Sequence, residues 1–181
     1  MLRKFVLLII MGCLVSSVVF GEPLHDAIQA GDLAQVKKLL GAGADINSSA
    51  SGKGGMTPLN YAAYEGHLEI VKLLLDKGAE IDTRDNMSFT PLLVAAISGH
   101  QEVQKELIIR GADVNLAERS FGWTTLHRAA ANGHLELIQL LLDKGAQINI
   151  KNKKGDTPLA VARQKGKTKA AELLKSRGGL E

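Results

Sequence analysis

The chain has 181 residues, of which 45% are hydrophobic and 23% charged, enough apolar material for one ordinary domain or a short array of repeats with a buried core. Only residues 5–20 form a long apolar run, so the sequence excludes a bundle of membrane-spanning helices. The formal net charge is +3, but residues 150–181 hold 9 basic and 3 acidic residues while residues 22–149 hold 11 and 16, so a basic end follows an acidic body.

The first predicted element is a secretory signal peptide over residues 1–21. Arg3 and Lys4 precede the apolar run FVLLIIMGCLVSSVVF, and the small residue Gly21 follows it, a pattern typical of an export signal cleaved after Gly21. Cleavage would leave a mature protein in the periplasm or outside the cell. It would contain no cysteine, because Cys13 is the only one in the sequence.

Two alternatives use the same residues. Residues 5–20, if uncleaved, would anchor the protein in a membrane, although this run is shorter than the roughly 20 residues that a span needs. Cys13 would be acylated in a lipoprotein, although further apolar residues follow it instead of a polar tether. The sequence predicts contact with a membrane only in these two cases.

The rest of the chain repeats itself. The segments EGHLEIVKLLLDKGAEI at 65–81 and NGHLELIQLLLDKGAQI at 132–148 are identical at twelve of seventeen positions. Glycines recur at intervals of 35, 33, 34 and 33 residues, namely Gly31, Gly66, Gly99, Gly133 and Gly166. Threonines recur at intervals of 33, 34 and 33, namely Thr57, Thr90, Thr124 and Thr157. Such a period indicates an array of similar structural units.

One unit can be read from its residues alone. Thr57 is expected to cap a short helix with its hydroxyl, and Pro58 to occupy the first turn, where its missing amide hydrogen costs nothing. Gly66 then lets the backbone turn with a positive φ. The next helix carries more apolar residues than one buried face needs: Leu68, Ile70, Val71, Leu73, Leu74 and Leu75. Each unit is therefore predicted to be unstable alone and to be stabilised by stacking on its neighbours.

The inner segments of the units read TPLNYAAYEGH at 57–67, TPLLVAAISGH at 90–100, TTLHRAAANGH at 124–134 and TPLAVARQKGK at 157–167. They resemble the ankyrin repeat, and the whole chain resembles an exported bacterial type with a signal peptide. The resemblance implies an all-α ankyrin-repeat solenoid of about five helix-turn-helix units with β-hairpin loops. The predicted domain covers 22–181, with an N-terminal capping repeat, three internal repeats and a C-terminal capping repeat at 22–52, 53–85, 86–118, 119–151 and 152–181.

The sequence predicts no enzyme, no cofactor and no metal site. GKGG at 52–55 lacks both the upstream glycine and the following Ser or Thr of a phosphate-binding loop. His67, His100 and His134 recur with the period, so they form a ladder instead of converging on a metal. They are expected to tie each inter-helix turn to a neighbouring loop by hydrogen bonds. The resemblance implies a loop-bracing role for His127 also, shared by Asn60 in an earlier unit.

Candidate binding residues are suggested by the aromatic side chains. All those outside the signal fall on inner helices or hairpins, which line the concave face where ankyrin proteins commonly recognise partners. Exposed apolar patches with aromatic anchors usually mark interaction sites. The predicted apolar stripe and its polar rim are Met56, Tyr64, Glu65, Met87, Phe89, Ile97, Ser98, Phe121, Trp123 and Asn132. The alternative is that the hairpin aromatics only pack against one another along the stack.

The sequence therefore predicts a non-enzymatic, monomeric scaffold that binds another protein through its concave face, with no small-molecule substrate and no nucleic acid. The alternative is a membrane-tethered adaptor whose basic C-terminal repeat contacts anionic lipid or nucleic acid. The residues for that alternative are Lys151, Lys153, Lys154, Arg163, Lys165, Lys167 and Lys169. A hydrolase or redox enzyme would need a pocket that the repeat pattern gives no reason to expect.

Overall fold

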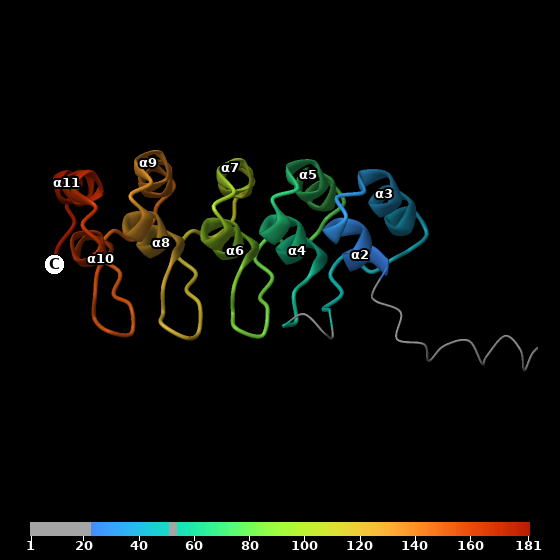
Figure 1. The fold of residues 1–181 in the computed structure, drawn as a ribbon, viewed down its shortest axis with the longest axis horizontal. Coiled ribbons are helices and arrows are strands. Elements are labelled where there is room, and N and C mark those ends of the chain that lie inside the picture. Colours follow the sequence, from blue (N-terminus) through green and yellow to red (C-terminus); the bar gives the residue numbers. More distant parts are fainter. Residues whose placement is uncertain (1–22, 51–53) are drawn as a thin grey trace, which may run out of the picture.

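The computed structural model describes residues 23–50 and 54–181, and the predicted signal peptide and the tip of the first loop lie outside these ranges. The described part folds into five antiparallel helix pairs that stand side by side in one row (Figure 1). The inner helices are α2 (Pro23–Gln29), α4 (Pro58–Glu65), α6 (Pro91–Ser98), α8 (Thr125–Asn132) and α10 (Pro158–Gln164). The outer helices are α3 (Leu33–Gly41), α5 (Leu68–Asp76), α7 (Gln101–Ile109), α9 (Leu135–Asp143) and α11 (Thr168–Ser176). This arrangement confirms an all-helical repeat fold.

The inner helices begin and end where the sequence predicts. The hydroxyl of Thr57 accepts a hydrogen bond from the backbone N–H of Asn60 at 3.3 Å, and the later three threonines cap their helices in the same way. Helices α4, α6 and α8 end at glycines with φ between 78° and 82°. This left-handed backbone favours glycine, so the chain turns there into the outer helix.

A single apolar core runs through the whole row. Leu74 on α5 and Leu141 on α9 are fully buried, and the core cluster includes residues from every helix pair. Each internal inner helix packs against the inner helices on both of its sides. Burial of a Leu or Ile side chain contributes roughly 1.5–3 kcal/mol, so stability comes from the stacking of short helices that are marginal alone.

Long loops connect each outer helix to the next inner helix and project from one side of the row (Figure 1). We call residues 82–89, 116–123 and 150–156 the finger loops. Within the described residues these loops contain no β-strand, and their one isolated antiparallel bridge joins Ala117 to Thr124. The predicted β-hairpin character of the loops is therefore not confirmed beyond this bridge.

A polar ladder ties the outer ends of the repeats together. A side-chain oxygen of Asn47, Asp82, Asn115 and Asn149 accepts a hydrogen bond from a backbone N–H one repeat later. Asn115 and Asn149 also donate their amide N–H to carbonyl oxygens of the next repeat, those of Gly145 and Gly178. Asp82 has no proton to donate in its ionised form. Burial, together with the charge of Asp113, raises the pKa of Asp82.

We expect Asp82→Asn to raise the free energy of unfolding at pH 7 by about 0.5–1.5 kcal/mol, because the amide can keep the existing hydrogen bond and add the missing one. A raised folded-state pKa means that the stabilising contribution of Asp82 is complete below its ordinary pKa of 3.8 and is lost as the pH rises through the folded value. The gain from the substitution should therefore shrink on acidification to pH 3.5, as measured by urea denaturation. The reciprocal variant Asn115→Asp is expected to lose stability at pH 7, and a gain there would contradict the explanation.

The junction between α6/α7 and α8/α9 lacks contacts that the neighbouring junctions have. Asn60 donates to the carbonyl oxygen of Phe89, and His127 Nε2 lies 3.1 Å from that of Asp156, which confirms both predicted braces. Leu93 occupies the equivalent position on α6 and has no polar atom in its side chain. The brace is therefore absent at this one place among the internal repeats of the described chain.

The turn histidines differ in the same way. His100 Nε2 lies 2.9 Å from the carbonyl oxygen of Tyr64, so the predicted tie between repeats is confirmed there. His67 lies over Gly31, but its Nε2 is buried and has no partner. His134 leaves open space over Gly99. The prediction that all three histidines form the same hydrogen bond is wrong, because even the close contact of His67 with Gly31 does not bring an acceptor within reach of its Nε2.

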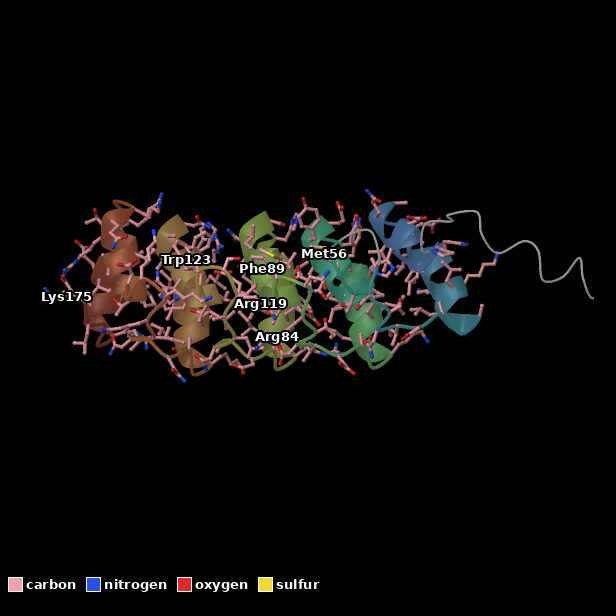
Figure 2. The ribbon with its side chains drawn as sticks, turned by 90° about the horizontal axis from the view of Figure 1, so that it is seen from below. Met56, Arg84, Phe89, Arg119, Trp123 and Lys175 are labelled. Atoms are coloured by element: carbon pink, nitrogen blue, oxygen red, sulfur yellow. The ribbon has the colours of Figure 1, made fainter. Side chains whose placement is uncertain are left out.

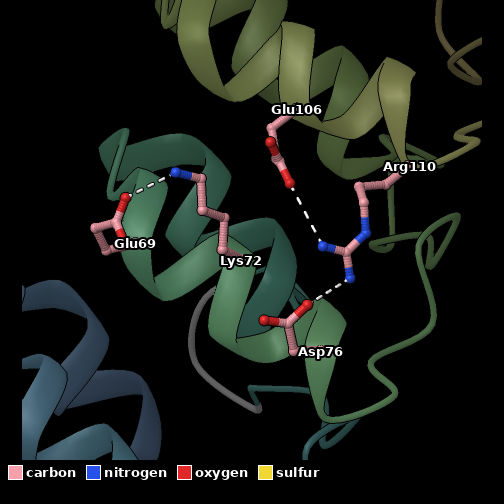
Figure 3. Close-up of polar contacts among 5 residues, drawn as sticks. All are labelled: Glu69, Lys72, Asp76, Glu106 and Arg110. Atoms are coloured by element: carbon pink, nitrogen blue, oxygen red, sulfur yellow. Dashed lines mark hydrogen bonds and ion pairs between the residues drawn. The ribbon is translucent and has the colours of Figure 1, made fainter.

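On the outer side, ion pairs link α5 to α7 and α9 to α11, but none links α7 to α9 in the described chain. Arg110 lies 2.7 Å from Asp76 of the preceding repeat and 3.5 Å from Glu106 on its own helix (Figure 3). Arg177 pairs with Asp143 in the same way at 3.0 Å. At the equivalent position α7 ends in Ile109, which is 64% exposed and cannot form such a pair. Exposed pairs of this kind contribute at most about 1 kcal/mol, so they adjust the stacking but do not determine it.

Candidate protein-interaction surface

Three large side chains lie in a row along the inner side of the stack: Met56, Phe89 and Trp123 (Figure 2). Each one immediately precedes the threonine that caps an inner helix, so the repeat itself places them at equal intervals. All three are partly exposed, and Met56 also packs against the apolar core. The row therefore offers aromatic surface mainly in the middle of the molecule.

Backbone hydrogen bonds join the finger loops to one another. The N–H of Asn86 donates to the carbonyl oxygen of Gly54 in the first loop of the chain at 2.9 Å, and the N–H of Arg119 donates to that of Met87 at 3.0 Å. The N–H of Lys153 donates to Phe121 at 2.9 Å. Each loop is therefore held in register with the previous one, and the side chains at the tips have a fixed spacing.

The finger loop at 116–123 is closed by a buried carboxylate. Glu118 is 2% exposed, and its two carboxylate oxygens accept hydrogen bonds from the backbone N–H groups of Ser120, Phe121 and Trp123. Asp85 closes the preceding loop by accepting from Met87 and Phe89. Acceptance of several backbone hydrogen bonds makes each loop a defined turn, so Phe89 and Trp123 extend from ordered backbone.

The structure places all ten predicted stripe and rim residues on α4, α6, α8 or the loops that precede them. Four of the apolar ones are about half exposed: Tyr64 at 48%, Met87 at 49%, Ile97 at 47% and Phe121 at 56%. Of the rim residues, Asn132 is exposed, and Glu65 and Ser98 are partly exposed. Large apolar side chains that remain in water on one face are the usual mark of an interaction surface.

Arg128 belongs to this surface, although the sequence analysis did not single it out. Its guanidinium carbon lies 4.7 Å from the centre of the Trp123 ring, a cation–π contact. Burial lowers the pKa of Arg128, and the negative charge of Glu118 opposes this shift. The available signal was the residue type: α8 carries an arginine where the inner helices of other repeats carry Tyr61 or Val94.

The basic C-terminal residues do not form one free patch. The ammonium group of Lys153 donates to the carbonyl oxygen of Arg119, and Arg163 pairs with Glu181. The side chain of Lys167 lies over Gly133, where the earlier repeats carry a histidine. Two of the cations considered for lipid or nucleic acid, Lys153 and Arg163, are therefore engaged within the protein.

Other kinds of site find little support in the described residues. No group of His, Cys, Asp or Glu there is placed to hold a metal ion. No helix in the same ranges is long and apolar enough to cross a membrane. A groove of about 260 Å³ lies on the outer side between α7 and α9, lined in part by Gln101, Gln104 and His134. It coincides with the junction that lacks the inter-repeat brace.

Comparison with known proteins agrees with this architecture. The family model described as ankyrin repeats (3 copies) matches residues 24–118 and 105–180, so the chain belongs to the ankyrin-repeat family. The probable E3 ubiquitin-protein ligase XBOS32 of Oryza sativa subsp. japonica is 40% identical over 74 residues, which is 41% of this chain and 14% of that protein. The ankyrin repeat, SAM and basic leucine zipper domain-containing protein 1 of Equus caballus is 42% identical over 59 residues, 33% of this chain and 12% of that protein. Ankyrin repeats are general protein–protein interaction modules, and these matches span a small part of much longer relatives.

Proposed function

We propose that the protein is a non-enzymatic scaffold that binds a partner protein through the inner helices and finger loops. The observation that carries this proposal is that Tyr64, Met87, Ile97 and Phe121, all on the inner helices and finger loops, remain about half exposed. If these side chains only packed against one another along the stack, a smaller fraction of each would be exposed. Their exposure favours a role in binding.

The scaffold would act by rigid presentation. The loops that carry Phe121 and Met87 are closed by Glu118 and Asp85 and are tied to their neighbours by backbone hydrogen bonds. A surface that is ordered before binding loses little conformational entropy when the partner docks, so more of the contact energy appears as affinity. No chemical step is part of this function.

The place where the scaffold acts is a further part of the proposal. It rests on the signal pattern of residues 1–21, which favours the periplasm or the outside of a bacterial cell. N-terminal sequencing of the exported protein tests this part, and a mature chain that begins at Glu22 is expected. Retention of residues 5–20 in a membrane fraction would instead support an uncleaved anchor.

The double variant Phe121→Ala, Trp123→Ala is expected to recover at least about tenfold less partner protein from the exported fraction than the wild type, because aromatic anchors carry most of the energy of an interface. Far-UV circular dichroism should show that both proteins fold. Ile109→Ala is the matched control, since Ile109 is 64% exposed but lies on an outer helix. Unchanged recovery with the double variant, or an equal loss with Ile109→Ala, would reject the proposed surface.

A further inference from the structure

Arg128 lies on α8, beside Trp123 of the proposed interaction surface. Within the described residues its guanidinium forms no ion pair and no hydrogen bond, and its Nε is buried without an acceptor. The ring of Trp123 covers one side of the guanidinium at 4.7 Å. A buried N–H donor without an acceptor lowers the stability of the fold. Such an arrangement is therefore expected where a binding partner supplies the acceptor.

The carboxylate that attracts Arg128, that of Glu118, forms no ion pair with it in the structure. Glu118 attracts Arg128 through space, but its oxygens already accept hydrogen bonds from three backbone N–H groups of its own loop. If Glu118 turned towards Arg128, the loop that positions Trp123 would lose these bonds. The carboxylate therefore stabilises the loop that positions Trp123, and within the described residues the Arg128 guanidinium has no hydrogen-bond acceptor.

We infer that Arg128 binds the carboxylate of an Asp or Glu in the partner protein, and that large apolar residues flank this acidic residue. The inference rests on the proposed function. The planar guanidinium can donate two parallel hydrogen bonds to a carboxylate, and stacking on Trp123 restricts its orientation before binding. Exposed Phe121 and Ile97, on the loop and inner helix of the same face, supply apolar surface for the flanking residues.

A protein carboxylate fits this surface better than a polyphosphate or an anionic bilayer. Binding to nucleic acid or to a charged membrane depends on several free cations acting together. Here the ammonium group of Lys153 donates to the carbonyl oxygen of Arg119, and the face that carries Arg128 also carries the half-exposed side chains of Phe121 and Ile97. A partly buried cation whose Nε is shielded from water, on a face with exposed apolar side chains, is complementary to a single acidic residue in an apolar segment.

The test selects random twelve-residue peptides displayed on phage against the wild-type protein, and then measures the affinity of the selected peptides for variants. Trp123 is the only tryptophan in the sequence, so its fluorescence reports binding at the site itself. We expect the selected peptides to be enriched in Asp or Glu next to apolar residues. Arg128→Met should weaken their binding about tenfold to a hundredfold, and Arg128→Lys should recover only part of it.

Lys175→Met is the matched control, because it removes the same charge from α11 at the end of the stack (Figure 2). It should leave peptide affinity unchanged, and Arg128→Met should unfold no earlier than the wild type. Selected peptides without acidic enrichment, or equal affinity for Arg128→Met, would overturn the inference and leave the scaffold function standing. No selected peptide at all, or a Trp123 response only to a single-stranded oligonucleotide or to phosphatidylglycerol vesicles, would also reject it.

Discussion

Gly66→Ala is expected to lower the free energy of unfolding by about 2–4 kcal/mol, whereas Gly99→Ala is expected to lower it by only about 1–2 kcal/mol. Both glycines have a left-handed backbone, with φ of 78° and 82°, so an added Cβ strains both turns similarly. At Gly66 the new Cβ would lie 2.4 Å from the His100 ring, and at Gly99 it would meet nothing within 4 Å. The difference between the variants therefore measures the histidine contact between repeats.

Urea denaturation followed by circular dichroism gives both free energies. To accommodate Cβ at Gly66, the ring of His100 must move and lose its 2.9 Å hydrogen bond to the carbonyl oxygen of Tyr64. In a His100→Ala background, Gly66→Ala should lower the free energy of unfolding by only as much as Gly99→Ala does, because the obstructing ring is gone. Equal losses for the two single variants would show that the ring moves aside freely and does not lock the turn.

Gln104→Ile is expected to raise the free energy of unfolding by about 1–3 kcal/mol. Gln104 is fully buried on α7, and its Oε1 has no hydrogen-bond partner. Its Nε2 donates to the carbonyl oxygen of Ala95, but that oxygen already accepts from the N–H of His100 at 3.0 Å. Loss of the amide hydrogen bond should therefore cost little stability. The substitution also removes a buried oxygen that has no hydrogen-bond partner, which should raise stability.

An isoleucine already fits the equivalent position in another repeat, since Ile138 is fully buried on α9. The matched control is Gln101→Leu, on the same helix but exposed, which should change stability by less than about 0.5 kcal/mol. Differential scanning calorimetry of the three proteins checks the order. Destabilisation by Gln104→Ile would contradict the prediction and would show that the amide is needed at the edge of the groove between α7 and α9.

The sequence by itself determined where the helices begin and end and that they stack. Thr57 and Gly66 act on backbone atoms within three or four residues, so their effect does not depend on the rest of the fold. Helices such as α5 carry too many apolar residues for one face, so these can be buried only by neighbouring repeats on both sides. The positions of Tyr64, Ile97 and Phe121 on one face followed from the same periodicity.

The tertiary structure alone decided how well each repeat fits the next. The hydrogen bonds of Asn60 and His100 reach atoms 29 and 36 residues away, so a recurring motif does not tell whether its partner is close enough. His100 and His134 are the same residue type at the same position of the repeat. Of these two, only His100 lies over the turn glycine of the preceding repeat. Arg128 likewise became a candidate anchor only when its guanidinium was found on Trp123 without an acceptor. Local capping depends on the residue and its immediate neighbours, whereas these contacts depend on small differences in the distance between separate repeats.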